Sequence, residues 1–208
     1  MARDASPRTV RETEAKFRVN PTFELPSILG AVPEVATIDK PTHISMHAVY
    51  YDTPDLRLAR EGVTLRRRSG GADAGWHLKL PVLSHTVPDG TGVRDEIQLP
   101  DSAAIPAELT TLVTVWARTA ALAPVATLAS ERTKLVLRGA DGAALAELVD
   151  DTVSVEGGSH NQAQFRELEV EDTGGGESIV AAVAAVLREA GAVGGECEGP
   201  GHAARICG

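Results

Sequence analysis

The chain has 208 residues, of which 43% are hydrophobic and 24% charged, enough for a single domain with one core. A formal net charge of −9 and an aromatic content of 3% argue against nucleic acid as a partner. No segment approaches the roughly 20 apolar residues of a membrane span, and Cys197 and Cys207 provide no disulfide framework. We therefore expect a cytoplasmic protein that meets any polyanion locally, through rows of cationic side chains.

The first predicted strand covers residues 9–19 and carries one charged face. Glu12, Glu14 and Lys16 occupy alternate positions, and Arg18 continues the series. Because strand side chains alternate with period two, these four charges point to one side and their apolar neighbours to the other. A solvated face of an antiparallel sheet shows the same alternation, so this strand alone does not decide which face is buried.

A short helix is expected over residues 21–30, followed by a strand over residues 43–51. Thr53 and Pro54 then match an N-cap with proline at the first helical position. The carboxylate of Asp52 is open to two interpretations. It either ends the strand beside a helix cap or has a catalytic role.

Four predicted strands in the middle of the chain carry charges at alternate positions. They are residues 63–69 with Arg66 and Arg68, 76–80 with His77 and Lys79, 93–99 with Arg94, Glu96 and Gln98, and 131–138 with Arg132, Lys134 and Arg138. Residues 81–92 are rich in proline and glycine and predict a loop, and residues 100–113 contain a helical candidate.

Two further charged strands follow a turn at Asp141 and Gly142, a sequence typical of a hairpin. They are residues 145–151 with Glu147 and Asp151 in phase, and residues 165–171 with Glu167, Glu169 and Glu171 in phase. Almost every strand thus offers a charged face.

The clearest helix covers residues 177–190, and Gly191 is its expected stop. Residues 191–208 contain no lysine and much glycine, which predicts an unpacked tail. Residues 1–8 are expected to form a flexible N-terminus. One domain, over residues 9–190, lies between these ends.

If these strands close into a barrel, one face lines its interior. Carboxylate pairs are hard-oxygen ligands for Mg²⁺ or Mn²⁺, and rows of arginine and lysine hold polyanions. The pattern supplies carboxylate pairs near the two ends of the chain and cations between them. Together these residues predict a binding site for a polyphosphate and its metal.

In this order the charged residues resemble the CYTH superfamily, also called the triphosphate tunnel metalloenzymes. The matching residues are Glu12, Glu14 and Lys16, the run Tyr51-Asp52-Thr53, Arg66 with Arg68, Lys79, Arg94 with Glu96, Arg132 with Lys134, Glu147 with Asp151, and Glu167 with Glu169. The resemblance covers about residues 8–190. It implies an α+β fold, a closed antiparallel eight-stranded β-barrel that forms a tunnel with a charged interior and peripheral helices.

Roles for these residues follow from their chemistry and from the resemblance. The catalytic candidates are Glu12, Glu14, Lys16 and Lys79. The phosphate-binding candidates are Lys16, Arg66, Arg68, Lys79, Arg94, Arg132 and Lys134. The metal candidates are Glu12, Glu14, Glu167, Glu169 and Asp151, with Glu96 and Glu147 as outer ligands or as partners that orient the cations. Glu171 and Arg138 are expected at strand ends.

Three functions agree with this pattern. The first is a metal-dependent triphosphatase that acts on inorganic tripolyphosphate or a small organic triphosphate, with Mg²⁺ or Mn²⁺ as cofactor. The second is a class IV-type adenylyl cyclase, and the third is a polyphosphate-binding module without activity. The expected partner is a small polyanion rather than nucleic acid or a membrane. A homodimer and a longer parent protein both stay open.

Overall fold

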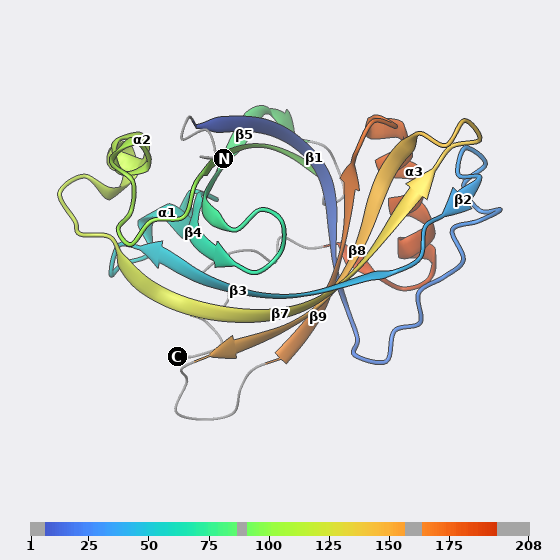
Figure 1. The fold of residues 1–208 in the computed structure, drawn as a ribbon, viewed down its shortest axis with the longest axis horizontal. Helices are drawn as coiled ribbons and strands as arrows, with labels where there is room; N and C mark the ends of the chain where they lie inside the picture. The colour runs from blue at the N-terminus through green and yellow to red at the C-terminus, as the bar shows by residue number, and fades with distance from the viewer. Residues whose placement is uncertain (1–6, 87–90, 157–163, 195–208) are drawn as a thin grey trace.

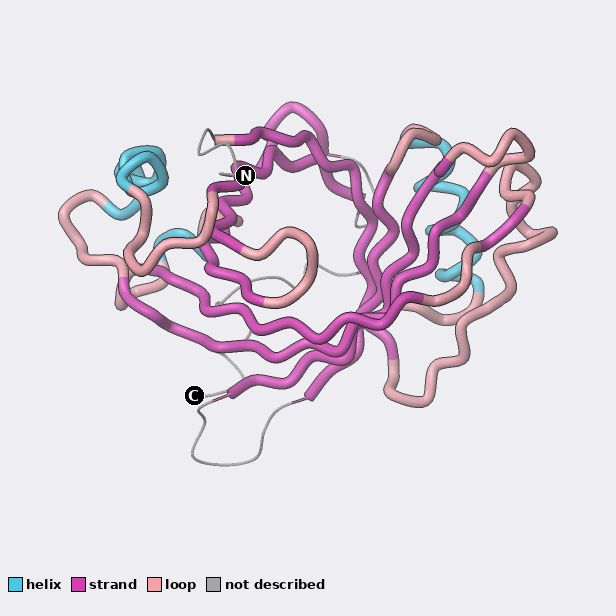
Figure 2. Tube along the Cα trace, in the orientation of Figure 1, coloured by secondary structure: helices cyan, strands magenta, loops and turns pink. Residues whose placement is uncertain are grey.

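The computed structural model describes residues 7–86, 91–156 and 164–194, and it confirms the predicted barrel (Figures 1 and 2). Eight antiparallel strands form a closed ring in the order β1, β6, β5, β4, β3, β7, β8, β9, and β9 pairs with β1. Their bounds are β1 Arg8–Val19, β3 Thr42–Asp52, β4 Thr64–Ser69, β5 Gly75–Thr86, β6 Thr91–Leu99, β7 Ala123–Arg138, β8 Ala144–Glu156 and β9 Gln164–Asp172.

Two short strands and three helices are added to this ring within the described residues. Strand β2, Thr37–Ile38, pairs with β7, and β10, Val193–Gly194, pairs with β1. The helices are α1 Arg57–Arg60, α2 Ala107–Ala117 and α3 Glu177–Glu189. None of them is long and apolar enough to cross a membrane.

The outer face of the barrel is apolar where helices cover it, which they do in two places (Figure 1). Under α3, the buried residues are Ala15, Phe17, Val19, Leu148, Leu168, Val170, Ile179, Val180, Val183, Ala184 and Leu187, among others. Under α1 and α2 they are Leu58, Val63, Leu65, Trp76, Leu78, Leu99, Leu109 and Val113. Burial of these side chains is the main force that holds the wall together.

Strand β1 closes the barrel because it has two partners. Its residues 8–15 pair with β6, and its residues 14–19 pair with β9. The first strand of the chain therefore lies beside the ninth, with Lys16 opposite Glu169 and Glu14 opposite Glu171. This register brings the acidic residues of the two ends of the domain to one seam.

The hairpin and the last helix form as their local sequences predict. Gly142 has a φ of +80° in the turn between β7 and β8, where the Asp141 carboxylate accepts the amide hydrogen of Ala143. Gly191, with a φ of +99°, ends α3 by donating its amide hydrogen to the Arg188 carbonyl. Only glycine adopts these conformations without strain.

The helix predicted over residues 21–30 is wrong. The segment consists of turns and extended chain, and Pro26 lies where a helix would need a free amide. The Asn20 side chain also accepts the amide hydrogen of Thr22, which holds a local turn in place of a helix.

The loop predicted over residues 81–92 is corrected as well. Strand β5 continues to Thr86 and β6 begins at Thr91, while residues 87–90 lie outside the described residues. Pro81 is accommodated next to a register shift in the β5–β6 pairing, a position where a strand tolerates the missing amide. The helical candidate predicted within residues 100–113 forms as α2, which begins at Ala107.

The first residues of the tail predicted over residues 191–208 are packed in the structure. Ala192 is buried under α3, and Val193 and Gly194 pair with Arg18 and Phe17 of β1. Residues 195–208, and residues 1–6 of the expected flexible N-terminus, lie outside the described residues.

Candidate active site

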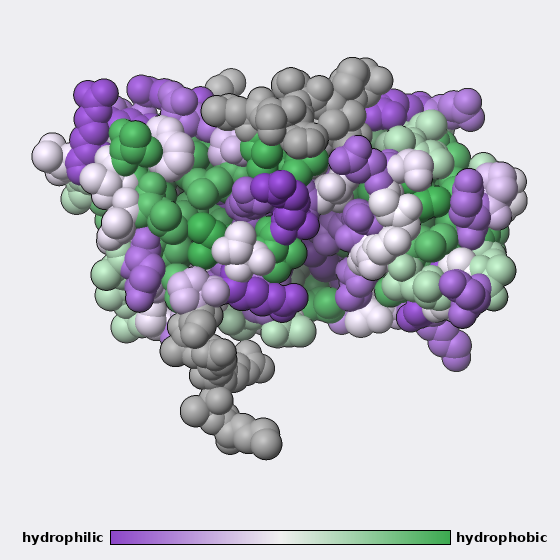
Figure 3. All heavy atoms as spheres, turned by 90° about the horizontal axis from the view of Figure 1, so that it is seen from above, coloured by the Kyte–Doolittle hydropathy of each residue, from purple (hydrophilic) through white to green (hydrophobic). Residues whose placement is uncertain are grey.

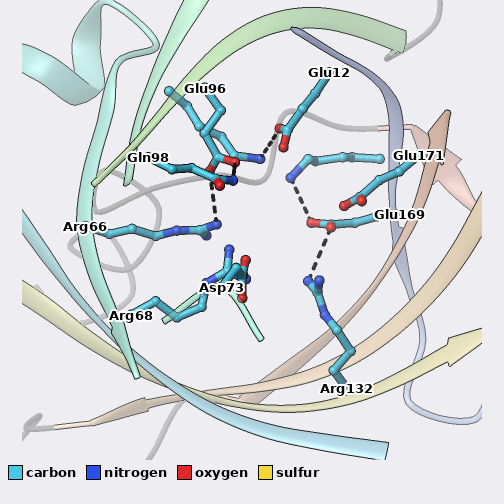
Figure 4. Close-up of a pocket in the computed structure, with 11 residues that line it drawn as sticks. Glu12, Arg66, Arg68, Asp73, Glu96, Gln98, Arg132, Glu169 and Glu171 are labelled. Carbon is cyan, nitrogen blue, oxygen red and sulfur yellow. Dashed lines mark hydrogen bonds and ion pairs between the residues drawn. The ribbon is translucent and has the colours of Figure 1, made fainter. Parts of the chain in front are cut away.

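The charged faces of the strands point into the barrel and line a pocket (Figure 4). The pocket holds about 400 Å³ of space, including space open to solvent. Its lining residues are Glu12, Lys16, Arg66, Arg68, Asp73, Lys79, Glu96, Gln98, Arg132, Glu169 and Glu171. Five are cations, five are acids and one is an amide, so the ionised lining carries no net charge.

Glu14 is the least satisfied acid of the barrel interior. Both of its carboxylate oxygens are buried and have no hydrogen-bond partner within the described part of the chain. The nearest cations are the Lys16 Nζ at 3.6 Å, the Arg94 Nε at 3.6 Å and the Lys79 Nζ at 3.8 Å. A buried carboxylate without hydrogen bonds is costly, and a bound cation would relieve this cost.

Two groups of acids at the seam have ligand oxygens close enough for one ion each. Glu14, Glu169 and Glu171 form one group, and Asp151, Glu167 and Glu169 form the other, with the oxygens of each within 4.8 Å of one another. Carboxylate oxygens in such groups are the ligands that Mg²⁺ and Mn²⁺ prefer. The residues present therefore fit a divalent cation, and Glu169 belongs to both groups.

The charges at the seam shift one another's protonation. Burial, reinforced by the charge of Glu169, raises the pKa of both Glu167 and Glu171 to about 8. Burial would also raise the pKa of Glu169, but Lys16 and Arg132 hold it well below its usual value. Glu169 therefore stays ionised while its two acidic neighbours hold protons easily.

Lys16 and Lys79 lie beside these acids. The Lys16 ammonium donates to Glu169 at 2.7 Å, and the Lys79 ammonium lies 2.8 Å from a Glu12 carboxylate oxygen. Burial opposes the charge of Lys16, but Glu14 and Glu169 outweigh it and raise the pKa of Lys16 above its usual value. Burial raises the pKa of Glu12, which Lys79 partly offsets.

Arg66 and Arg68 face these groups from the opposite side of the pocket, whereas Arg132 lies beside Glu169 (Figure 4). Arg132 donates to Asp151 at 2.6 Å and to Glu169 at 3.4 Å. Arg66 has looser partners: its guanidinium lies 3.4 Å from the Tyr50 hydroxyl and 3.8 Å from Glu96. Its Nε is buried without a hydrogen bond to any described residue, which leaves donors available for an anion.

His77 and Gln98 hold Glu96 in place. The ring of His77 is 1% exposed, with Nδ1 2.9 Å from Glu96 and Nε2 2.7 Å from the Asp73 carbonyl. Gln98 donates to the second Glu96 oxygen at 2.7 Å. Burial would raise the pKa of Glu96, but the hydrogen bond from His77 and the charge of Lys79 lower it. Glu96 is thus an ionised acid that orients cations.

Most, but not all, of the residues expected at the site line this pocket. Arg94 lies against Glu14, and Lys134 pairs with Glu147 at 3.1 Å. The other residues outside its lining are Glu14, Asp151 and Glu167. Conversely, Glu171 was expected to be a rim residue rather than a ligand, but it lines the pocket and belongs to one of the acidic groups, because its register places it opposite Glu14.

Asp52 is buried and acts as a cap. Its carboxylate accepts the amide hydrogens of Thr53 at 2.6 Å and of Leu58 and Ala59 at 3.0 Å. The predicted start of the helix, with Thr53 as N-cap and Pro54 as its first residue, is wrong: α1 begins at Arg57 and Leu56 is its N-cap. The Thr53 hydroxyl accepts the amide hydrogen of Arg57. Of the two interpretations of Asp52, the structure supports the helix cap.

Besides Glu171, three residues that contact the site were not among the predicted site residues. His77 and Gln98 were recognisable from their phase with Lys79 and Glu96, because in-phase residues share the lumen. Asp73 lies in a loop without periodicity, and no local pattern places it in the pocket.

The fold and site define a class of protein: closed antiparallel barrels with a charged interior and a group of acids suited to a cation. The family model of the CYTH domain matches residues 10–196. The chain belongs to the CYTH family.

The chain is also similar to one curated protein in sequence and to two solved structures in fold. An uncharacterized protein of Mycobacterium tuberculosis (strain ATCC 25618 / H37Rv), Rv2226, is 44% identical over 154 residues, which cover 72% of this chain and 28% of that protein. The chain therefore spans less than a third of the length of this relative. A candidate adenylate cyclase from Bacillus halodurans has the same fold, with a TM-score of 0.60 and 18% identity over 92% of this chain and 95% of the other. The protein PH1819 from Pyrococcus horikoshii OT3 has a TM-score of 0.50 and 14% identity, over 94% and 98% of the two chains.

Proposed function

We propose that this protein hydrolyses a triphosphate inside the barrel with the help of Mg²⁺ or Mn²⁺. The substrate is inorganic tripolyphosphate or a small organic triphosphate. The observation that carries this proposal is the buried carboxylate of Glu14, which accepts no hydrogen bond from the part of the chain that the structure describes and lies beside a lumen lined by five cations. Membership of the CYTH family supports it, because the family resemblance implies triphosphate chemistry.

Glu14, Glu169 and Glu171 are the residues that would hold the cation, and Asp151 and Glu167 would complete a second group around Glu169. When bound, a divalent cation supplies positive charge that neutralises phosphate oxygens. This charge matters here because the ionised lining is balanced, whereas a triphosphate carries about four negative charges near neutral pH.

The cationic side chains bind and orient the substrate. Arg66 and Arg132 would hold non-bridging oxygens through guanidinium hydrogen bonds, and Lys16 and Lys79 would face the same anion from the seam. In the reaction, a water oxygen bonds to the terminal phosphorus and the bridging P–O bond breaks. Orthophosphate leaves, and the diphosphate end retains the bond electrons. Fixed cations stabilise the charge that develops on the bridging oxygen.

An adenylyl cyclase is the second candidate, and an apolar cluster near Arg66 favours it. Tyr50 hydrogen-bonds Arg66 and packs with buried Leu128, Val153 and Val155, with Phe165 against them. An aromatic and aliphatic wall of this kind is what a purine ring packs on. A cyclase would release pyrophosphate and cyclic AMP from ATP, whereas a triphosphatase releases orthophosphate.

The test measures phosphate release from tripolyphosphate, thiamine triphosphate and ATP with Mg²⁺, Mn²⁺ or EDTA. We expect metal-dependent release that falls by about 100-fold or more in Glu14→Gln, because the variant loses a charged ligand. Glu108→Gln, an exposed residue of α2, is the matched control and keeps wild-type turnover. Near-normal turnover in Glu14→Gln would remove Glu14 from the site. Tripolyphosphate binding without release from any substrate would identify a binding module.

A further inference from the structure

The loop between β4 and β5, residues 70–74, folds into the barrel instead of away from it (Figure 2). Gly70 has a φ of +82°, and a Cβ there would lie 2.4 Å from the Ser45 carbonyl of β3. Gly75 has a φ of +149°, and a Cβ there would lie 2.4 Å from the Leu99 carbonyl. Glycine at both ends therefore allows the chain to pass close to its neighbours and turn inward.

This path places Asp73 in the pocket, against a cation expected to bind phosphate (Figure 4). The Asp73 carboxylate accepts a hydrogen bond from the Arg68 Nη1 at 2.7 Å. The Asp73 carbonyl lies 2.7 Å from the Nε2 of buried His77, which anchors the loop backbone. Geometrically, the carboxylate stands where a phosphate oxygen would meet Arg68.

The Asp73–Arg68 pair is also the one most easily opened. The Asp73 side chain is 40% exposed, whereas Glu169 beside Lys16 is 7% exposed and Asp151 beside Arg132 is 4% exposed. Exposed ion pairs contribute little free energy, so replacing a solvated carboxylate costs less than breaking a buried pair. The other two acids extend from barrel strands, while Asp73 extends from a loop.

We propose that Asp73 competes with phosphate for Arg68 and so sets the affinity of the pocket for anions. An anion reaches Arg68 only by displacing this carboxylate, which also removes one of the five acids from the lining. A triphosphate that contacts Arg66 and Arg132 at the same time offsets this cost with further contacts, whereas orthophosphate has fewer contacts and binds more weakly. This inference rests on the proposed function, since it concerns the affinity of the same site.

The test is calorimetric binding of tripolyphosphate and of orthophosphate to the full chain with Mg²⁺ present. We expect Asp73→Asn to bind both anions about five- to tenfold more tightly than the wild type, because a half-exposed ion pair no longer has to open. Asp73→Glu keeps the charge and remains near wild type. Asp101→Asn is the matched control, because Asp101 pairs with Arg67 on the outer face, 2.6 Å away, and its loss leaves affinity within about twofold.

Unchanged or weaker binding in Asp73→Asn, with a melting temperature like that of the wild type, would overturn the proposal. Equal gains in Asp73→Asn and Asp101→Asn would also overturn it, since they would reflect net charge alone. Phosphate release is measured on the same samples. Tighter binding without release from any substrate would overturn the hydrolase function while supporting the competition at Arg68.

Discussion

Strand β4 holds two neighbouring arginines in opposite surroundings. Arg67 points outward and makes a close pair with Asp101, 2.6 Å away, in which both side chains are well exposed. Arg66 points inward and is much less exposed, yet its nearest polar partners lie 3.4 and 3.8 Å away. The outer charge is satisfied and contributes little, whereas the inner charge is desolvated and only loosely paired. We expect such an arrangement to favour binding of an anion more than it favours stability.

A similar contrast holds where helices cover the barrel. The outer face is packed under these helices, and on the face drawn in Figure 3 hydrophobic side chains gather in patches bordered by hydrophilic ones. The inner face gathers cations and acids that partly neutralise one another. Outer residues are thus expected to determine folding and inner residues to determine binding, and four measurements examine this division.

The largest effect is expected from the β4 pair itself. Arg66→Ala should lower kcat/KM for the triphosphate by about 100- to 1000-fold, because a desolvated contact to phosphate is lost. Arg67→Ala should stay within about threefold, since it removes only an exposed ion pair. Steady-state kinetics on both variants provides the comparison. Equal losses would show that the strand phase does not separate the two faces.

An outer-face truncation should do the reverse. Leu148 is fully buried under α3, so Leu148→Ala should lower the free energy of unfolding by about 2–5 kcal/mol through lost burial and a cavity. Turnover per folded molecule should not change. Leu29, which is 46% exposed, is the control position for Leu29→Ala. Denaturant unfolding measures both variants, and a similar stability loss in the two would contradict the core assignment.

The inner face should make the metal-free protein sensitive to pH. The pKa of Glu167 and of Glu171 is raised to about 8 in the folded chain. The folded state therefore binds protons that the unfolded state releases, and its stability is highest below about pH 4.5 for these groups and declines as the pH rises toward 8.

Thermal unfolding in EDTA should show this as a fall of a few degrees in Tm between about pH 6 and pH 8. Added Mg²⁺ should raise Tm more at pH 8 than at pH 6, because a cation binds the deprotonated carboxylates. Leu148→Ala should show the same pH profile from a lower starting Tm. An identical Mg²⁺ effect at both pH values would argue against a cation at the seam.

The smallest effect is expected from Asp52, a buried carboxylate at the end of β3 that does not line the pocket. Asp52→Asn should lower the free energy of unfolding by about 1–2 kcal/mol, because the carboxylate accepts three backbone amide hydrogens around α1. Turnover should remain near wild type. The exposed neighbour variant Asp55→Asn should change the unfolding midpoint little. A large loss of turnover in Asp52→Asn at normal stability would restore a catalytic role for this residue.

Much of the site could be predicted because strand alternation is a local property. Glu12, Glu14 and Lys16 share a face through their spacing alone, and the same holds for Arg66 with Arg68 and for the acids of β9. His77 is in phase with Lys79, which predicts that its side chain also faces the lumen. Its ring contacts Glu96 and not one of the residues expected to bind phosphate. Helix α3 could also be predicted, since its apolar stripe and the glycine that ends it lie within one segment of the chain.

Other features of the fold and site could not be predicted, because they depend on contacts that the sequence pattern does not show. The helix expected over residues 21–30 fails because local turn hydrogen bonds and Pro26 outweigh a weak pattern. Glu171 belongs to the pocket because the β1–β9 register sets it opposite Glu14. Asp73 enters the pocket because the loop has close glycine contacts with β3 and β6.

The sequence by itself determined which charged residues share a face, because period two along a strand involves only neighbours in the chain. It did not determine which face is inside, nor which charges meet. Closure of β1 on β9 brings together residues separated by about 150 positions, such as Lys16 and Glu169. Their distance depends on strand register, twist and the helices that pack outside. Only the tertiary structure therefore decided that Glu14 has no hydrogen-bond partner among the described residues and that Asp73 pairs with Arg68.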